Sequence, residues 1–96
     1  MIIASLSIST LGKSTSVSTY VKIVIETLKK EHVKFQTNAM ATVIETNDIE
    51  TLFHVVQKAH QAVAEQGADR IITEIKIDDR RDKEATMKSK LDSLKK

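Results

Sequence analysis

The sequence contains no cysteine, no tryptophan and few other aromatic residues, and each shortage excludes a class of function. Without cysteine the chain forms no disulfide, offers no thiolate nucleophile and cannot ligate a metal through sulfur, as paired-cysteine heavy-metal transport domains do. One tyrosine and two phenylalanines leave little surface on which a nucleobase or sugar could stack. Stacking-based nucleic-acid recognition is therefore not expected.

The sequence also has no large excess of charge of one sign and no long apolar run. The 15 basic and 13 acidic residues are interspersed and give a net charge of +2, too small to indicate nucleic acid or an anionic membrane as the partner. No stretch approaches the ~20 apolar residues that cross a bilayer, and the apolar start IIASLSIS lacks the basic segment of a signal peptide. We expect one cytoplasmic domain over residues 1–96, with no nucleic-acid or membrane partner.

No spacing of catalytic or metal-binding residues is recognisable. His54 and His60 would lie about 120° apart around a helix, so they could not chelate one metal ion, and His32 falls in a predicted loop. The sequence has neither a glycine-rich phosphate loop nor a recognisable serine–histidine–aspartate spacing. We therefore expect a protein that is not an enzyme, with no catalytic residues, no metal and no cofactor.

Alternating apolar and polar residues predict four strands. Residues 2–9 and 70–77 alternate clearly, and residues 33–37 and 40–46 predict two shorter strands that turn around Asn38.

Helical spacing of apolar residues predicts three helices. The first should bury Val17, Val21, Val24, Ile25 and Leu28. The second, between a capping Asn47 and a terminating Gly67, should bury Ile49, Leu52, Phe53, Val56, Ala59 and Val63. The third should pack through Met87, Leu91 and Leu94. The order of elements predicts an α+β protein, a ferredoxin-like βαββαβ sandwich with an additional C-terminal helix.

Two helices cover one face of such a sheet and leave the other face open. The strand residues assigned to the open face are small or polar without being uniformly charged: Ser5, Ser7, Gln36, Asn38 and Glu74 beside Ile3 and Ile72. A fully solvated face would carry more lysine and glutamate. The composition favours packing against another subunit.

Two polar segments each have two interpretations. The hydroxyl run STSVS at residues 14–18 either caps a helix or forms a ligand rim at the positive helix end. The charged run IKIDDRRDK at residues 75–83 either neutralises itself locally or makes a subunit contact. The contact is favoured, with Asp78 or Asp79 meeting an arginine of a neighbouring subunit, and Asp78 is also a secondary candidate for a pocket.

Five segments together, LGKSTSVSTYV, MATVIET, KAHQAV, GADRI and IKIDDRRDK, resemble the small thiamine-binding protein family over roughly residues 2–90. Members are stand-alone relatives of the YkoF-type thiamine/hydroxymethylpyrimidine-binding domains. The resemblance implies a ferredoxin-like fold, sheet-to-sheet dimers that assemble into tetramers, and a pocket for thiamine or its pyrimidine half at subunit contacts. The chain departs from the family pattern where Ala39 replaces a proline and Ala41 and Thr46 replace glycines.

Matching the family motifs residue by residue gives a candidate ligand set. Its members are Thr15, Ser16, Ser18, Thr37, Asn38, Met40, Glu45 and Asp78. Hydroxyl and amide groups suit an aminopyrimidine, Met40 offers an adaptable apolar wall, and Glu45 would neutralise the thiazolium cation. The predicted function is non-enzymatic binding of thiamine or hydroxymethylpyrimidine by a cytoplasmic homo-oligomer, a dimer of dimers, in vitamin salvage, trafficking or sensing. The alternative is a structural or regulatory oligomer that binds a small anion or no ligand.

Overall fold

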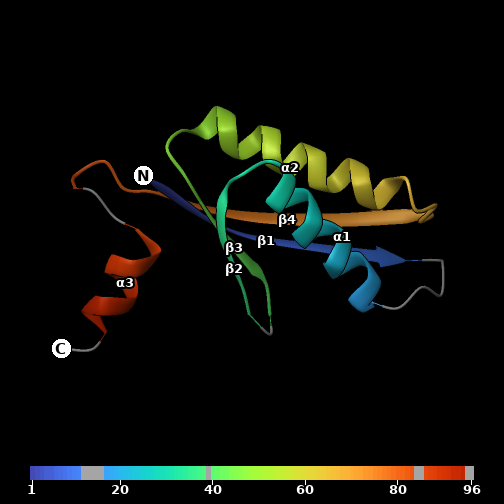
Figure 1. Cartoon of the computed structure of the whole chain (residues 1–96), viewed down its shortest axis with the longest axis horizontal. Coiled ribbons are helices and arrows are strands. Elements are labelled where there is room, and N and C mark those ends of the chain that lie inside the picture. Colours follow the sequence, from blue (N-terminus) through green and yellow to red (C-terminus); the bar gives the residue numbers. More distant parts are fainter. Residues whose placement is uncertain (12–16, 39, 84–85, 95–96) are drawn as a thin grey trace.

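The computed structural model describes residues 1–11, 17–38, 40–83 and 86–94, with Val17 and Ser18 described by their backbone alone. Its elements follow the predicted order (Figure 1). They are β1 (Ile2–Leu11), α1 (Val17–Lys30), β2 (Lys34–Thr37), β3 (Thr42–Thr46), α2 (Ile49–Ala64), β4 (Arg70–Asp79) and α3 (Met87–Ser93). The predicted ferredoxin-like fold with an additional C-terminal helix is confirmed.

The four strands form one antiparallel sheet in the order β2-β3-β1-β4. β1 pairs with β4 along its whole length, from Ile2 opposite Asp79 to Leu11 opposite Arg70. Its pairing with β3 is shorter and ends where Leu6 lies opposite Thr42. The far half of β1 therefore has a strand on one side only.

Helices α1 and α2 lie on one face of the sheet, and α3 lies on the other side at one end (Figure 1). The largest fully buried side chains lie between the sheet and the two long helices: Leu6, Leu28, Ile44, Leu52, Val55 and Val63. Burying each of these stabilises the fold by roughly 1.5–3 kcal/mol relative to exposure. None of the described helices is long and apolar enough to cross a membrane.

Two predicted core positions of α2 are wrong. Phe53 is 50% exposed and Ile49 is 40% exposed, whereas Val55, which was not predicted, is 1% exposed. The buried stripe is centred on Leu52 and Ala59, and Phe53 is rotated about 100° from Leu52 around the helix. The flank of the helix therefore reaches solvent.

The apolar stripe on α1 is rotated in the same way. Tyr20 is 3% exposed and lies in the core with Val24 and Leu28, whereas the predicted core residue Val21 is 37% exposed. On α3 only Met87 is buried, and Leu91 is 49% exposed.

The second helix begins one residue later than predicted. Asp48, and not Asn47, is the N-cap, and its carboxylate accepts a hydrogen bond from the Thr51 amide at 2.7 Å. This hydrogen bond, supported by the Thr51 hydroxyl, lowers the pKa of Asp48. The predicted terminator Gly67 lies just beyond the helix with φ of 85°, a conformation that favours glycine.

Candidate functional site

A pocket of about 200 Å³ lies between the far half of β1, the first half of α1 and the β2–β3 turn. It exists because β3 begins at Thr42, opposite Leu6, while β1 continues to Leu11. On that side the backbone of Ser7 to Ser9 has no strand partner among the described residues, so its N–H and C=O groups are not used by β3. The pocket therefore has backbone hydrogen-bonding groups as well as side chains along one wall.

The β2–β3 turn is held by Asn38. Its side-chain oxygen accepts hydrogen bonds from the backbone amides of Met40 at 2.8 Å and Ala41 at 2.9 Å. The backbone amide of Asn38 donates to the Ala41 carbonyl at 2.9 Å. Because the oxygen is occupied, the group that Asn38 can offer to a ligand is its NH₂ donor. The turn thus fixes the orientation of the Asn38 side-chain amide.

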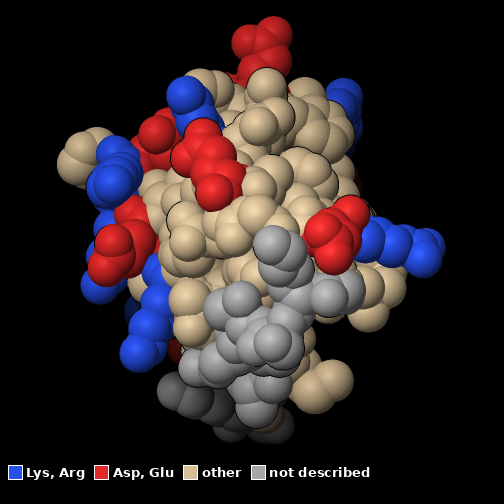
Figure 2. Space-filling model, turned by 90° about the vertical axis from the view of Figure 1, so that its right-hand side faces the viewer, with Lys and Arg blue, Asp and Glu red and all other residues tan. Residues whose placement is uncertain are grey.

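The described residues that line this pocket carry no charge. The polar ones are Ser7, Ser9, Thr37, Asn38 and Thr42, and the others are Leu6, Ile8, Val21, Val24, Met40 and Ala41. Figure 2 looks onto the end of the molecule where β1 finishes and α1 begins; the uncharged surface there is interrupted by acidic side chains, and lysine and arginine side chains lie mainly at its margins. Such a lining suits a neutral ring with a few donors and acceptors.

Three of the eight predicted ligand residues, Thr37, Asn38 and Met40, line this pocket. Thr15 and Ser16 lie outside the described residues, and Ser18 is described only as part of the first turn of α1. Ser7 and Ser9 were not predicted as ligand residues. Their signal was the alternation of small hydroxyls along β1, which had been assigned to the open face alone.

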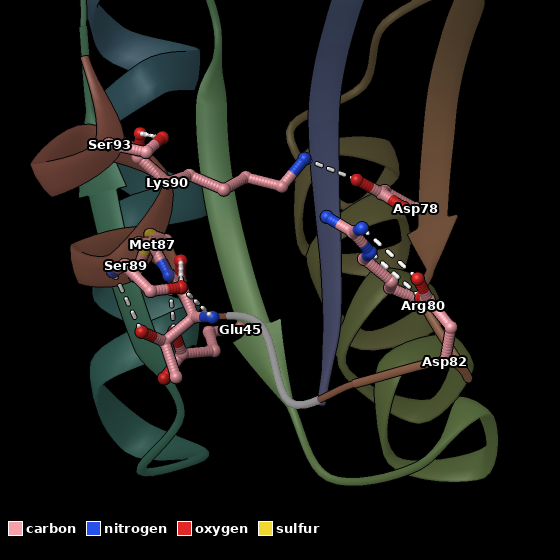
Figure 3. A network of polar contacts seen from close by, with 9 residues as sticks. Glu45, Asp78, Arg80, Asp82, Met87, Ser89, Lys90 and Ser93 are labelled. Carbon is pink, nitrogen blue, oxygen red and sulfur yellow. Dashed lines mark hydrogen bonds and ion pairs between the residues drawn. The ribbon is translucent and has the colours of Figure 1, made fainter.

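Glu45 is placed elsewhere within the chain. It pairs with Ile3, on the sheet face opposite to the core residue Ile44, and its side chain is 3% exposed. The carboxylate accepts a hydrogen bond from the Met87 amide at 2.7 Å (Figure 3). The Lys34 ammonium lies 3.8 Å from the other carboxylate oxygen. Glu45 therefore holds the start of α3 and does not reach the pocket in the same chain.

The start of α3 is also closed by its own residues. Thr86 accepts a hydrogen bond from the Ser89 amide at 3.0 Å, and the Ser89 hydroxyl accepts one from the Thr86 amide at 2.8 Å. This reciprocal capping box, together with Glu45, satisfies amide groups that a helix start leaves unpaired.

Asp78 forms an ion pair with Lys90 of α3, whose side chain extends toward β4 (Figure 3). Between α3 and the sheet is a second hollow of about 470 Å³, with Ile3 and Val43 in its apolar lining and Asp78 and Lys90 among its charged groups. Asp78 thus lies with Glu45 on the open face, away from the pocket beside Asn38.

Four further residues of the charged run pair with one another within the chain. Arg80 donates two hydrogen bonds to Asp82, at 2.8 and 3.0 Å, and Arg81 donates two to Asp79, at 3.1 and 3.0 Å. The hydrogen bond to Asp82 raises the pKa of Arg80, and the same bond lowers the pKa of Asp82. In one chain, local neutralisation is the arrangement that these residues adopt.

The histidines do not converge. His54 bonds to Glu31 at 2.9 Å, and His60 bonds to the Thr73 hydroxyl at 2.7 Å. Across the described ranges, no three histidine, aspartate or glutamate side chains are arranged to hold a metal ion.

Relatives of known sequence cover the chain almost completely. The family described as thiamine-binding protein matches residues 4–95. The UPF0045 protein of Methanothermobacter thermautotrophicus is 43% identical over 96 residues, which cover 99% of this chain and 97% of that protein. The UPF0045 protein YqgV of Bacillus subtilis is 41% identical over 101 residues, covering 100% of this chain and 96% of that protein.

Solved structures share the same architecture. The hypothetical protein MJ1052 from Methanocaldococcus jannaschii superposes with a TM-score of 0.88 at 42% identity, covering 98% of this chain and 95% of that one. TM0486 from Thermotoga maritima, described as a candidate thiamine biosynthesis/salvage protein, gives a TM-score of 0.81 at 17% identity, with 97% of each chain covered. At that identity the second likeness shows the fold alone.

Proposed function

The chain belongs to the thiamine-binding protein family, and from that premise we propose that it binds hydroxymethylpyrimidine, or the same aminopyrimidine half of thiamine, in the pocket beside Asn38. The observation that carries the proposal is the lining that the structure describes: hydroxyls, one oriented amide donor and apolar walls, with no charged side chain among these residues. A volume of about 200 Å³ suits one substituted ring, since pockets for drug-sized ligands begin at roughly 300 Å³.

Each part of an aminopyrimidine has a counterpart in the pocket. The Asn38 NH₂ group would donate to a ring nitrogen, and a backbone carbonyl of the Ser7–Ser9 edge, which β3 does not use, would accept from the exocyclic amine. Val24 offers an apolar wall, and Met40, which is 86% exposed, stands at the rim where it can fold over the ring. We assign Thr15, Ser16 and Ser18 to the same ligand from the family motif.

Among the described residues, the pocket lining supplies no carboxylate for the thiazolium cation, because Glu45 is bound to α3 on the other face. We therefore place the thiazolium outside this pocket and expect thiamine and hydroxymethylpyrimidine to bind with similar affinity. Asp78, paired with Lys90, is assigned to holding α3.

Binding without chemistry suits a role in vitamin salvage, trafficking or sensing in the cytoplasm. The name of the Thermotoga maritima neighbour, which refers to thiamine biosynthesis or salvage, supports this role by analogy. We propose that the chain works as a homo-oligomer, a dimer of dimers, in which open sheet faces pack together. The small and apolar residues that remain accessible on that face, such as Ser5 and Ile72, support this assembly.

The sharpest test uses Asn38→Asp. The new side chain keeps the oxygen that accepts from Met40 and Ala41, so the turn stays closed, but it loses the NH₂ donor and adds a charge. Calorimetric titration with hydroxymethylpyrimidine should show at least a tenfold loss of affinity, about 1.4 kcal/mol. Asn47→Asp, the same change at an exposed position outside the pocket, is the control and should bind as the wild type does.

Titration of the wild type with thiamine, thiamine phosphates and sulfate completes the test. Heat with sulfate but none with any thiamine compound would replace this proposal with the alternative, a structural or regulatory oligomer that binds an anion. No heat with any of them would leave an oligomer without a small ligand.

A further inference from the structure

The two edges of the sheet are unequal. One edge strand, β2, has only four residues, so it offers little backbone for another strand to pair with. β4 ends the other side with ten residues, Arg70–Asp79, in continuous register with β1 and without a bulge. The outer side of β4 has no strand partner among the described residues.

Natural proteins usually protect such an edge with proline, a bulge or a lone lysine. The sequence has no proline, and the register of β4 has no bulge. Lys76 does lie on the edge strand, but Glu74 lies two residues away on the same face, so the edge carries both signs of charge. An edge with both signs can match a partner edge of opposite order.

We propose that β4 pairs antiparallel with β4 of a second copy of this chain, around a two-fold axis at Ile75, and so joins two sheets into one. Facing residues in an antiparallel pair share a sheet face. A pairing that keeps the helices of both copies on one side must therefore be centred on a residue, and not between two residues.

Charge selects the register. Centred on Ile75, the pairing sets Glu74 opposite Lys76 of the partner subunit, twice by symmetry, and keeps residues 71–79 facing one another. A pairing centred on Glu74 or on Lys76 would place that residue opposite the same residue of the partner subunit, and the two like charges would repel each other. A centre farther along the strand shortens the overlap.

Contacts within the described part of one chain leave the charges of Glu74 and Lys76 available for this pairing. Glu74 lies opposite Ser7 and Lys76 opposite Ser5 on β1, both neutral, and neither charge forms an ion pair with another described residue. On the helix side, Ile75 would meet Ile75 of the partner subunit and extend the apolar layer. This inference does not depend on the ligand proposal.

The test is charge reversal followed by analytical ultracentrifugation. Glu74→Lys sets lysine against lysine and Lys76→Glu sets glutamate against glutamate, so each should raise the dissociation constant of this contact at least about tenfold and halve the mass of the assembly. The double variant Glu74→Lys/Lys76→Glu should assemble as the wild type does. An equimolar mixture of the two single variants should also assemble, because every facing pair is then opposite in charge.

Glu26→Lys, the same reversal on an exposed position of α1, is the control and should leave the mass unchanged. Circular dichroism establishes that each variant is folded. A wild type found only at 10.7 kDa, single variants that assemble normally, or a folded double variant that does not recover would each overturn the proposal. Calorimetry with hydroxymethylpyrimidine on the dissociated variants distinguishes this outcome from failure of the ligand proposal, because loss of assembly with retained binding concerns the β4 edge alone.

Discussion

The two faces of the sheet come from alternate residues of the same strands, but different interactions hold their neighbours in place. On the covered face, Leu6 is 2% exposed and Ile44 fully buried, packed under α1 and α2. On the open face, α3 is attached by the buried side chain of Met87 and by polar contacts, from Glu45 to the Met87 amide and from Asp78 to Lys90.

This difference separates stability from association. Burial of apolar surface contributes about 25 cal/mol per Å² and needs no special geometry, so the covered face supplies most of the folding free energy. An exposed ion pair such as Asp78–Lys90 contributes roughly 0–1 kcal/mol, so it can be exchanged for contacts with a ligand or another subunit at small cost. Substitutions on the two faces should therefore have different kinds of effect.

The largest expected effect is on the covered face. Leu52→Ala removes a fully buried side chain from the centre of the core and should lower the free energy of unfolding by about 2–5 kcal/mol in chemical denaturation. The matched control is its neighbour Phe53→Ala, which removes a larger but half-exposed side chain and should cost no more than about 1 kcal/mol. Equal costs would mean that the faces of α2 are not as distinct as the structure shows.

On the open face, Glu45→Ala should release α3 and leave the core intact. The buried Met87 amide loses its acceptor, at a local cost of about 1–3 kcal/mol. Hydrogen exchange should show its protection falling roughly 5- to 150-fold, while the amides of α2 change little.

Two further variants isolate the cause. Glu45→Gln keeps an acceptor oxygen and should retain most of the protection of the Met87 amide. Asp78→Asn breaks only an ion pair whose side chains are 46% and 47% exposed, so its effect should stay within about 1 kcal/mol. Unchanged exchange in Glu45→Ala would show that α3 is held by other contacts.

The sequence predicted the fold well because strand alternation is a strong signal. Ala4 and Leu6 are buried as their alternation requires, and Ile72 and Glu74 lie on the open face. Helix faces were predicted less well. Phe53 is as apolar as Val55, so composition alone could not show which of the two faces the sheet.

The candidate site was predicted in part for a similar reason. Thr37, Asn38 and Met40 are close in sequence, and one turn brings them together. Glu45 follows only five residues after Met40, but the alternation of β3 turns it to the opposite face, where a helix more than forty residues away in the chain binds it at Met87. A long-range contact of this kind leaves no local pattern in the sequence.

The covered face contains a buried polar atom that lacks a hydrogen bond in the part of the chain that the structure describes. The Tyr20 hydroxyl is buried and has no hydrogen-bond partner among the described residues. Tyr20→Phe removes it and keeps the ring, so the protein should become more stable by about 1 kcal/mol, the low end of the cost of a buried unpaired polar group. Tyr20→Leu, which also removes the ring, should destabilise, and a loss of stability in Tyr20→Phe would show that the hydroxyl has a partner.

The smallest expected effect concerns Asp48, the exposed N-cap of α2 on the covered face. The Thr51 amide, and then its hydroxyl, lower the pKa of Asp48 from its ordinary value of 3.8. A carboxyl whose pKa is lower in the folded state stabilises the fold fully above the ordinary value, and this contribution is lost as the pH falls through the folded-state value.

Asp48→Asn also caps a helix but does not titrate. The melting temperature of the wild type relative to this variant should be constant from pH 7 to about pH 5 and should then decline below about pH 4. Parallel curves over the whole range would mean that the Asp48 carboxylate is not what closes the start of α2.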